Sequence, residues 1–276
     1  MLAPMLLLIL GLFVGSLFFA LGQSLGYMPI IDEYDLTLTH YVNIVRSRDF
    51  WASAAMTFHI AFTSTFLSTV LAVASALALR ETFWGKKAVV FLFQLSLPIP
   101  HLIAALAILL LTTQSGLVAR LAYHAGLITE PADFPALVFD RFSIGIILVY
   151  LVKEVPFIGI TVLAILHGVG REYEQSAATL GARRWQRFRY VLLPFIAPGL
   201  LSVFIVVFAY LFGAFEIPYL LGRTYPAALP VLAYRSYVDF NLKARPESMA
   251  MSVLILIFTL LMTAVYMRIS RVYIRR

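Results

Sequence analysis

Five ionisable side chains lie inside long apolar stretches of the sequence, where burying a charge is costly. They are His59, His101, Lys153, Glu154 and Glu216. Ionisable residues at membrane depth usually face a cavity or pair with one another, so these residues are candidates to line or brace a path for a substrate. The alternative is that they are buried structural groups bonded to neighbouring helices. For both histidines we expect this buried, hydrogen-bonded role.

Four residues form the candidate path: Pro100, Lys153, Glu154 and Glu216. Lys153 and Glu154 are adjacent, and adjacent helical side chains point about 100° apart, so we expect each to have a different partner. Pro98, Pro100 and Pro218 lie within or beside apolar runs and free backbone carbonyls there. Such unwinding is tolerated only where the backbone is buried in protein or lines a cavity.

The residue types give no sign of catalysis. The 276-residue sequence contains no cysteine, which excludes disulfides, thiolate metal sites and cysteine nucleophiles. It has no Walker loop, no Gly-x-Ser-x-Gly elbow and no His, Asp or Glu set with metal-ligand spacing. We therefore expect no catalytic residue, metal or cofactor, and any ATP that drives the protein must bind another subunit.

The composition places these residues in a membrane. Apolar residues make up 62% of the chain and charged residues 13%, against about half and a quarter in soluble domains. Six apolar segments are long enough to cross about 30 Å of hydrocarbon as helices: 3–22, 52–79, 88–112, 143–167, 195–221 and 248–267. The prediction is an all-α, polytopic membrane protein with one transmembrane domain over 1–276. The first segment could be a cleaved signal peptide, but it lacks a basic start, so we expect it to be retained.

Basic residues are unequally divided between the two sets of links. Three links hold 12 Arg and Lys residues: 80–87, 168–194 and 268–276. The alternate links hold 8: 23–51, 113–142 and 222–247. The positive-inside rule therefore places the first set and both termini in the cytoplasm. Because topology explains the net charge of +7, we expect contact with membrane lipid and none with nucleic acid.

The 168–194 link has a helical pattern of its own. Glu174 would lie in the first turn of a short helix that ends at Gly181, where the helix dipole favours anions. Trp185 and Phe188 then share a face of a second amphipathic piece, and Pro194 is expected to break it where the next span begins. This pattern alone predicts two helices on the membrane surface whose arginines contact lipid headgroups.

The run EQSAATLGARRWQRFRYVLLPFIAPG, from Glu174 to Gly199, resembles the EAA loop of type I binding-protein-dependent ABC importer permeases. That loop reads Glu-Ala-Ala, three residues, Gly, and then a stretch that ends in Leu-Pro. Gly181, Leu193 and Pro194 are in register with it. We expect Gly181 to let the two short helices pack closely and Pro194 to set the turn into the membrane.

One part of the loop departs from the family pattern. Gln175 and Ser176 occupy the positions of the usual Glu and first Ala, Ala177 matches the second, and Glu174 lies one residue early. The polar contact that the family's Glu makes with its ATPase can therefore pass to Glu174 or to Gln175. The expected coupling residues are Glu174, Gln175, Ser176, Ala177, Gly181, Arg184, Leu193 and Pro194.

Four shorter segments resemble the spermidine/putrescine, iron and phosphonate branch of these permeases: 97–100, 153–157, 215–222 and 229–234. The resemblance implies a multi-pass permease of the bacterial inner membrane whose 168–194 loop docks on a cytoplasmic ATPase dimer, which binds the ATP. It also implies a second permease, in this branch usually a homologue, and a periplasmic or lipid-anchored substrate-binding protein.

Two other functions compete with this interpretation. An ion-coupled secondary transporter ordinarily has inverted repeats and several carboxylates within the membrane. A stand-alone membrane enzyme needs a paired acid and base or a metal set. Neither pattern is visible in the sequence, which also leaves open the substrate and whether the second permease is a copy or a homologue.

Overall fold

The computed structural model describes residues 3–81, 84–169 and 171–274, so Arg275 and Arg276 of the charge count lie outside the described residues. The regular elements of these residues are helical, apart from one isolated bridge between Met28 and Glu33. Six segments are long and apolar enough to cross a membrane: Pro4–Ser24, Arg48–Arg80, His101–His124, Ile144–Gly168, Arg184–Gly213 and Leu242–Arg268. The predicted all-helical fold with six spans is confirmed.

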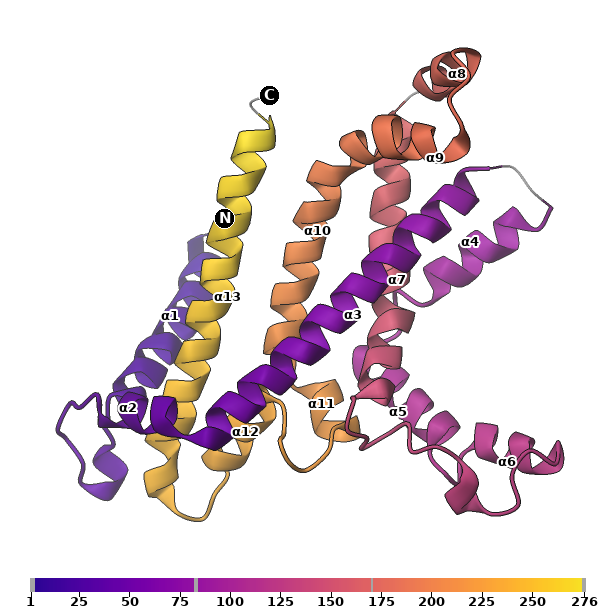
Figure 1. The fold of residues 1–276 in the computed structure, drawn as a ribbon. Helices are drawn as coiled ribbons and strands as arrows, with labels where there is room; N and C mark the ends of the chain where they lie inside the picture. Colours follow the sequence, from indigo (N-terminus) through magenta and orange to yellow (C-terminus); the bar gives the residue numbers. More distant parts are fainter. Residues whose placement is uncertain (1–2, 82–83, 170, 275–276) are drawn as a thin grey trace.

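The long helices run between two sides of the molecule (Figure 1). They are α1 (Ala3–Ser24), α3 (Arg48–Arg80), α7 (Ile144–Gly168), α10 (Leu193–Gly213) and α13 (Arg245–Ile274). One side, here called the loop side, carries α8 (Arg171–Thr179) and α9 (Arg184–Arg187), the end of α3 and the C-terminal end of α13. The opposite side carries α2 (Thr39–Arg46), α6 (Leu117–His124), α11 (Glu216–Leu221) and α12 (Leu229–Tyr237).

Two of the predicted spans are broken. The segment 88–112 forms α4 (Lys86–Leu95) and α5 (His101–Thr112), with irregular backbone between them at Pro98 and Pro100. This is the unwinding that these prolines predicted, because proline lacks the N–H that a regular helix needs. The segment 195–221 is also two helices, since α10 ends at Gly213 and α11 begins at Glu216, so its predicted single span is wrong.

A stripe of small residues explains why α3 packs closely along α7. The buried members of the stripe follow one another at intervals of three or four: Ser53, Thr57, Ala61, Ser64, Ser68, Ala72 and Ala76. Small side chains at this spacing let two backbones approach. A Cβ added to Gly159 of α7 would lie 3.8 Å from the Ala72 carbonyl oxygen of α3. It would lie 3.0 Å from Phe93 Cε1 of the helix Lys86–Leu95, which also packs there.

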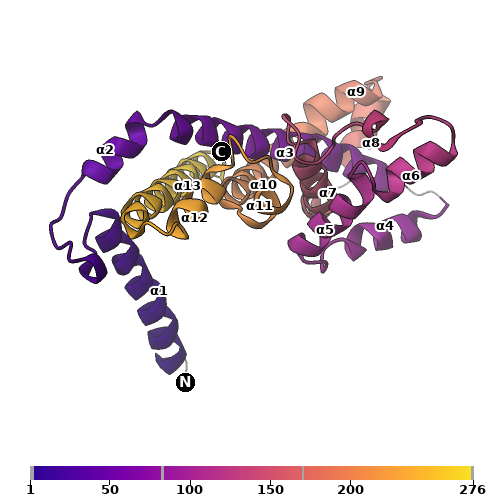
Figure 2. The ribbon, with the colours of Figure 1, turned by 90° about the horizontal axis from the view of Figure 1, so that it is seen from below.

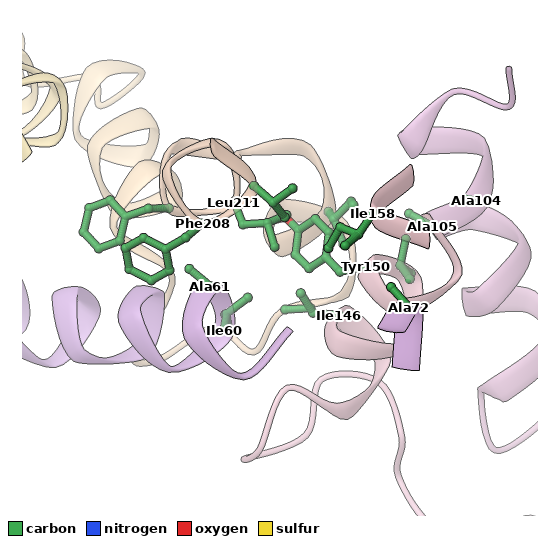
Figure 3. Packing of buried hydrophobic residues seen from close by; sticks show 14 of the residues in the cluster. Ile60, Ala61, Ala72, Ala104, Ala105, Ile146, Tyr150, Ile158, Phe208 and Leu211 are labelled. Carbon is green, nitrogen blue, oxygen red and sulfur yellow. The ribbon is translucent and has the colours of Figure 1, made fainter. Parts of the chain in front are cut away.

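Two apolar clusters hold the helices together. The larger one joins α3, α5, α7, α10 and α11, and Figure 3 shows Tyr150, Ile158 and Leu211 packed at its centre. The smaller one lies toward the opposite side and joins α2, α3, α12 and α13 through Ile44, Phe50, Leu229, Ala233, Ala250 and Met251. Seen from below, α3 extends along α13, α10 and α7 (Figure 2), and it contributes residues to both clusters, as α12 also does.

Candidate functional site

The two short helices of the loop side are joined at Gly181. The Gly181 N–H donates to the Ala178 carbonyl at 2.9 Å and the Ala182 N–H to the Ala177 carbonyl at 3.0 Å, which is the Schellman pattern of a helix end. Gly181 has φ +81°, a backbone region that favours glycine. A Cβ added there would meet nothing within 4 Å, so the expectation that Gly181 permits close packing is wrong. Its conformation requires glycine.

The chain does not leave its helix at Pro194. Helix α9, a π-helical turn over Phe188–Leu192 and α10 form one run from Arg184 to Gly213, and the expected break is wrong. Proline cannot donate the next helical hydrogen bond, and the wider turn that precedes it accommodates this loss. Figure 1 shows that the run bends between α9 and α10.

The coupling residues divide by exposure. Gln175, Ser176, Arg184 and Pro194 are exposed, whereas Ala177 and Leu193 are half-buried. Glu174 is also half-buried, because its carboxylate pairs with the guanidinium of Arg80 at the end of α3. Glu174 is thus bound within the chain, while Gln175 presents its amide to the surroundings of the loop.

Lys153 braces the break in the third span. Its ammonium donates to the carbonyl oxygens of Ser96 (2.5 Å), Leu97 (3.2 Å) and Ile99 (2.7 Å), and only 4% of the residue is exposed. An ammonium has three N–H donors, so the unwound backbone uses all of them. The structure thus shows Lys153 as a buried group bonded to a neighbouring segment, which was the alternative to a role in the path.

Glu154 has a different partner, as its position next to Lys153 predicted. Its carboxylate lies 3.3 Å from His101 Nε2. Pro100, the N-cap residue of α5, precedes that histidine, and the ring of Tyr210 lies 5.5 Å from the His101 ring. Helix α11, which begins at the exposed Glu216 after the break in the fifth span, packs against α5, which follows the break in the third span. The two breaks therefore lie close to the polar group formed by Glu154, His101 and Tyr210.

Sequence reasoning missed Tyr210 and misplaced His59. Tyr210 is a phenol inside the apolar run 195–213, which is the signal that could have identified it. His59 was expected to be buried, but it is exposed, since it lies on the side of α3 that the clusters leave uncovered. It is hydrogen-bonded as expected, with Nε2 3.1 Å from the Phe142 carbonyl oxygen.

Comparison with known proteins decides the class of the chain. Residues 68–276 match the model of the family described as binding-protein-dependent transport system inner membrane component. The chain belongs to this family. It is the permease subunit of a binding-protein-dependent ABC importer, a multi-pass protein of the inner membrane without an ATPase domain.

Individual relatives support this assignment along almost the whole permease. The trehalose/maltose transport system permease protein MalF of Thermococcus litoralis is 25% identical, over 98% of this chain and 92% of that protein. The inner membrane ABC transporter permease protein YcjO of Escherichia coli is 29% identical, over 95% and 90%. These relatives agree with the family that the model match shows, and they favour no particular branch of it.

A solved structure shares the fold. The permease superimposes on a chain of a bacterial ABC transporter that imports the acidic polysaccharide alginate, with a TM-score of 0.81 and 20% identity over 98% of this chain and 93% of that one. At this identity the likeness concerns the fold alone.

Proposed function

We propose that the permease forms a substrate path together with a second, homologous permease and docks through α8 and α9 on a cytoplasmic ATPase dimer. A periplasmic or lipid-anchored binding protein delivers the substrate. The observation that carries this proposal is the EAA-like register, which lies on two helices at the extremity of the loop side with Gln175 and Ser176 exposed. Movement of these helices would be passed to α7, which precedes α8 in the chain, and to α10, which follows α9.

The charge distribution supports a cytoplasmic loop side. The described parts of the links that hold 12 basic residues lie on the loop side, and the links that hold 8 lie at the other end of the long helices. Positively charged links stay in the cytoplasm during insertion. Both termini would then be cytoplasmic too.

Cysteine labelling tests the docking surface and its sidedness in one experiment, because the chain has no cysteine of its own. Ser176→Cys should react with a membrane-impermeant maleimide only from the cytoplasmic side. In whole membranes it should also cross-link to a protein that mass spectrometry identifies as an ATPase. The matched variant on the opposite side is Leu127→Cys, at a residue that is 78% exposed. It should react only from outside and give no cross-link to the ATPase.

Thr129 is another position for the outer cysteine, but it is hydrogen-bonded within a turn, so Leu127 is the better choice. The backbone N–H and hydroxyl of Thr129 donate to the Asp133 carboxylate at 2.9 and 2.8 Å, which lowers the pKa of that carboxyl. A cysteine at Thr129 would disturb this turn. Labelling in the reverse pattern would contradict both the orientation and the ATPase contact.

We also propose that Pro100, Glu154 and Glu216 border the substrate path, with Lys153 as the brace behind it. Two broken spans meet around Tyr210, and irregular backbone at membrane depth is typical of a cavity shared with a facing subunit. The exposed rings of Tyr219 and Tyr234 lie 5.6 Å apart on α11 and α12, and Tyr219 follows Glu216 by three residues on α11. Phenol rings next to a carboxylate suit a sugar, whose apolar face stacks while its hydroxyls donate hydrogen bonds.

We infer the substrate class from the substrates in the relatives' names and not from the four short segments that resemble one branch of the family. One relative is named for trehalose and maltose and another for diacetylchitobiose, although others are named for molybdenum and sulfate. A carbohydrate therefore replaces the spermidine/putrescine, iron and phosphonate branch as our proposed substrate class.

Glu216→Gln should lower sugar uptake by about tenfold if the carboxylate contacts the substrate, as expected for one charged hydrogen bond. The measurement is ATP-driven uptake of labelled maltose by the complex in proteoliposomes, with spermidine as the comparison. Complex yield should stay unchanged, because Glu216 is exposed. Unchanged uptake would show a surface residue, and a loss of assembled complex would show a structural ion pair with the facing permease.

A further inference from the structure

A single arginine joins three elements on the loop side. Arg80 is the last residue of α3, and its guanidinium pairs with the carboxylate of Glu174 in α8, which is 94 residues later in the chain. Its Nη2 also donates to the carbonyl of Val169 at 3.1 Å, and Val169 is the residue that caps α7. The end of α3 is thereby fixed to the coupling helix and to the helix that leads into it.

The burial of Arg80 makes this connection more than a surface ion pair. Exposed pairs contribute little because water and salt screen them. Arg80 is only 7% exposed, so its charge has lost most of its hydration and depends on the carboxylate and the carbonyl for compensation. The planar guanidinium presents several donors in fixed directions, which suits it to hold two acceptors at once. We expect α8 and the end of α3 to move together.

Helix α3 reaches from this contact to the opposite side. It runs from Arg48 to Arg80 without a proline or glycine. Near its other end, Asp49 Oδ1 accepts a hydrogen bond from the Tyr225 hydroxyl at 2.8 Å, and the buried Thr57 Oγ1 accepts one from the Leu229 N–H at 2.7 Å. Tyr225 lies just before α12 and Leu229 is its first residue, so α3 is bonded to the loop on one side and to the start of α12 on the other.

We propose that Arg80 is a positioning residue that transmits the displacement of α8 to α3. ATP-driven movement of the loop then reaches the opposite side through α3, as well as through α7 and α10, which follow the loop covalently. This inference rests on the proposed docking of α8 on an ATPase. It assigns Glu174 to the contact with α3 and leaves Gln175, at the position of the family's Glu, for the ATPase.

The test compares substitutions in the complete complex in proteoliposomes, with the substrate transported per ATP hydrolysed as the readout. Arg80→Gln should lower this ratio by at least about fivefold, the lower range of typical coupling between sites. The ATPase should still co-purify, because Gln175 and Ser176 are untouched. The exchange Arg80→Glu with Glu174→Arg should recover part of the ratio. Lys87→Gln, which removes an exposed charge on the same side, should leave it unchanged.

The outcomes separate this inference from the docking proposal. A wild-type ratio in Arg80→Gln, with the ATPase bound, overturns the role of Arg80 and leaves docking intact. Failure of the unsubstituted chain to hold an ATPase overturns docking and the inference with it. If Arg80→Gln does not assemble, Glu174→Gln breaks the same pair from its more exposed partner. A wild-type ratio in that variant also overturns the inference.

Discussion

Lys153→Met should lower the free energy of unfolding of the permease by at least about 3 kcal/mol, because three buried carbonyls lose their donor and each unsatisfied acceptor costs about 1–3 kcal/mol. Methionine resembles lysine in length but has no N–H to donate. The carbonyls of Ser96, Leu97 and Ile99 would each lose a charge-assisted hydrogen bond in a region that water reaches poorly. The measurement is thermal unfolding of the purified complex in mild detergent, together with its yield.

Lys87→Met is the matched control, because Lys87 is an exposed lysine of the neighbouring link and the same side chain is exchanged. Its unfolding temperature should stay close to that of the wild type. Lys153→Arg should be intermediate, since arginine retains charge and donors but places them in a planar fork. Wild-type stability of Lys153→Met would contradict the bracing role and would return Lys153 to the list of path residues.

The third span shows how far sequence reasoning reaches in such a protein. Pro98 and Pro100 predicted unwound backbone at membrane depth, and Lys153 was recognised as a costly intramembrane charge. The sequence did not predict that the Lys153 ammonium donates to the carbonyls of this unwound backbone. More than 50 residues separate the donor from its acceptors, and their contact depends on how α4 and α5 pack against α7. One point of that packing is Gly159 of α7, where an added Cβ would lie 3.0 Å from Phe93 of α4.

The fifth span shows the opposite case, in which the sequence signal itself misleads. Ala214 and Phe215 interrupt the helix, yet both are apolar, and hydropathy therefore extends the predicted span across them to 221. In the same way Pro194 signals a helix end, but the π-helical turn before it absorbs the missing hydrogen bond. Hydropathy locates where the chain meets lipid, whereas helix ends are decided by local backbone bonding.

The EAA-like register marked a loop that the structure forms from two short helices, but it did not give the contacts of the loop's residues. It left Glu174 and Gln175 as equal candidates for one role. The structure adds a contact that the motif did not predict, because Glu174 pairs with Arg80, which lies outside the motif and far from it in sequence. Glycine was expected at position 181 either for close approach of the backbones or for a positive φ, and the structure shows the positive φ.

Gly181→Val should abolish most transport while the six spans still insert and fold. Valine in the left-handed region costs roughly 1–2 kcal/mol or more, because its branched side chain clashes with the backbone in that conformation. The strain falls on the Schellman bonds that set α8 against α9, so the docking surface should lose its shape. We expect at least about a tenfold fall in ATP-driven uptake and in co-purified ATPase, since 1.4 kcal/mol corresponds to a factor of ten.

Two further variants decide whether conformation is the cause. Gly168→Val makes the same change on the same link, where a Cβ also meets nothing within 4 Å and the glycine has no positive φ, so uptake should stay close to wild type. Gly181→Asn adds a side chain of similar size that tolerates the left-handed region, and it should keep much more activity than Gly181→Val. Equal loss in Gly181→Asn and Gly181→Val would mean that the free space around this helix end is itself occupied in the complex, by the ATPase that docks there.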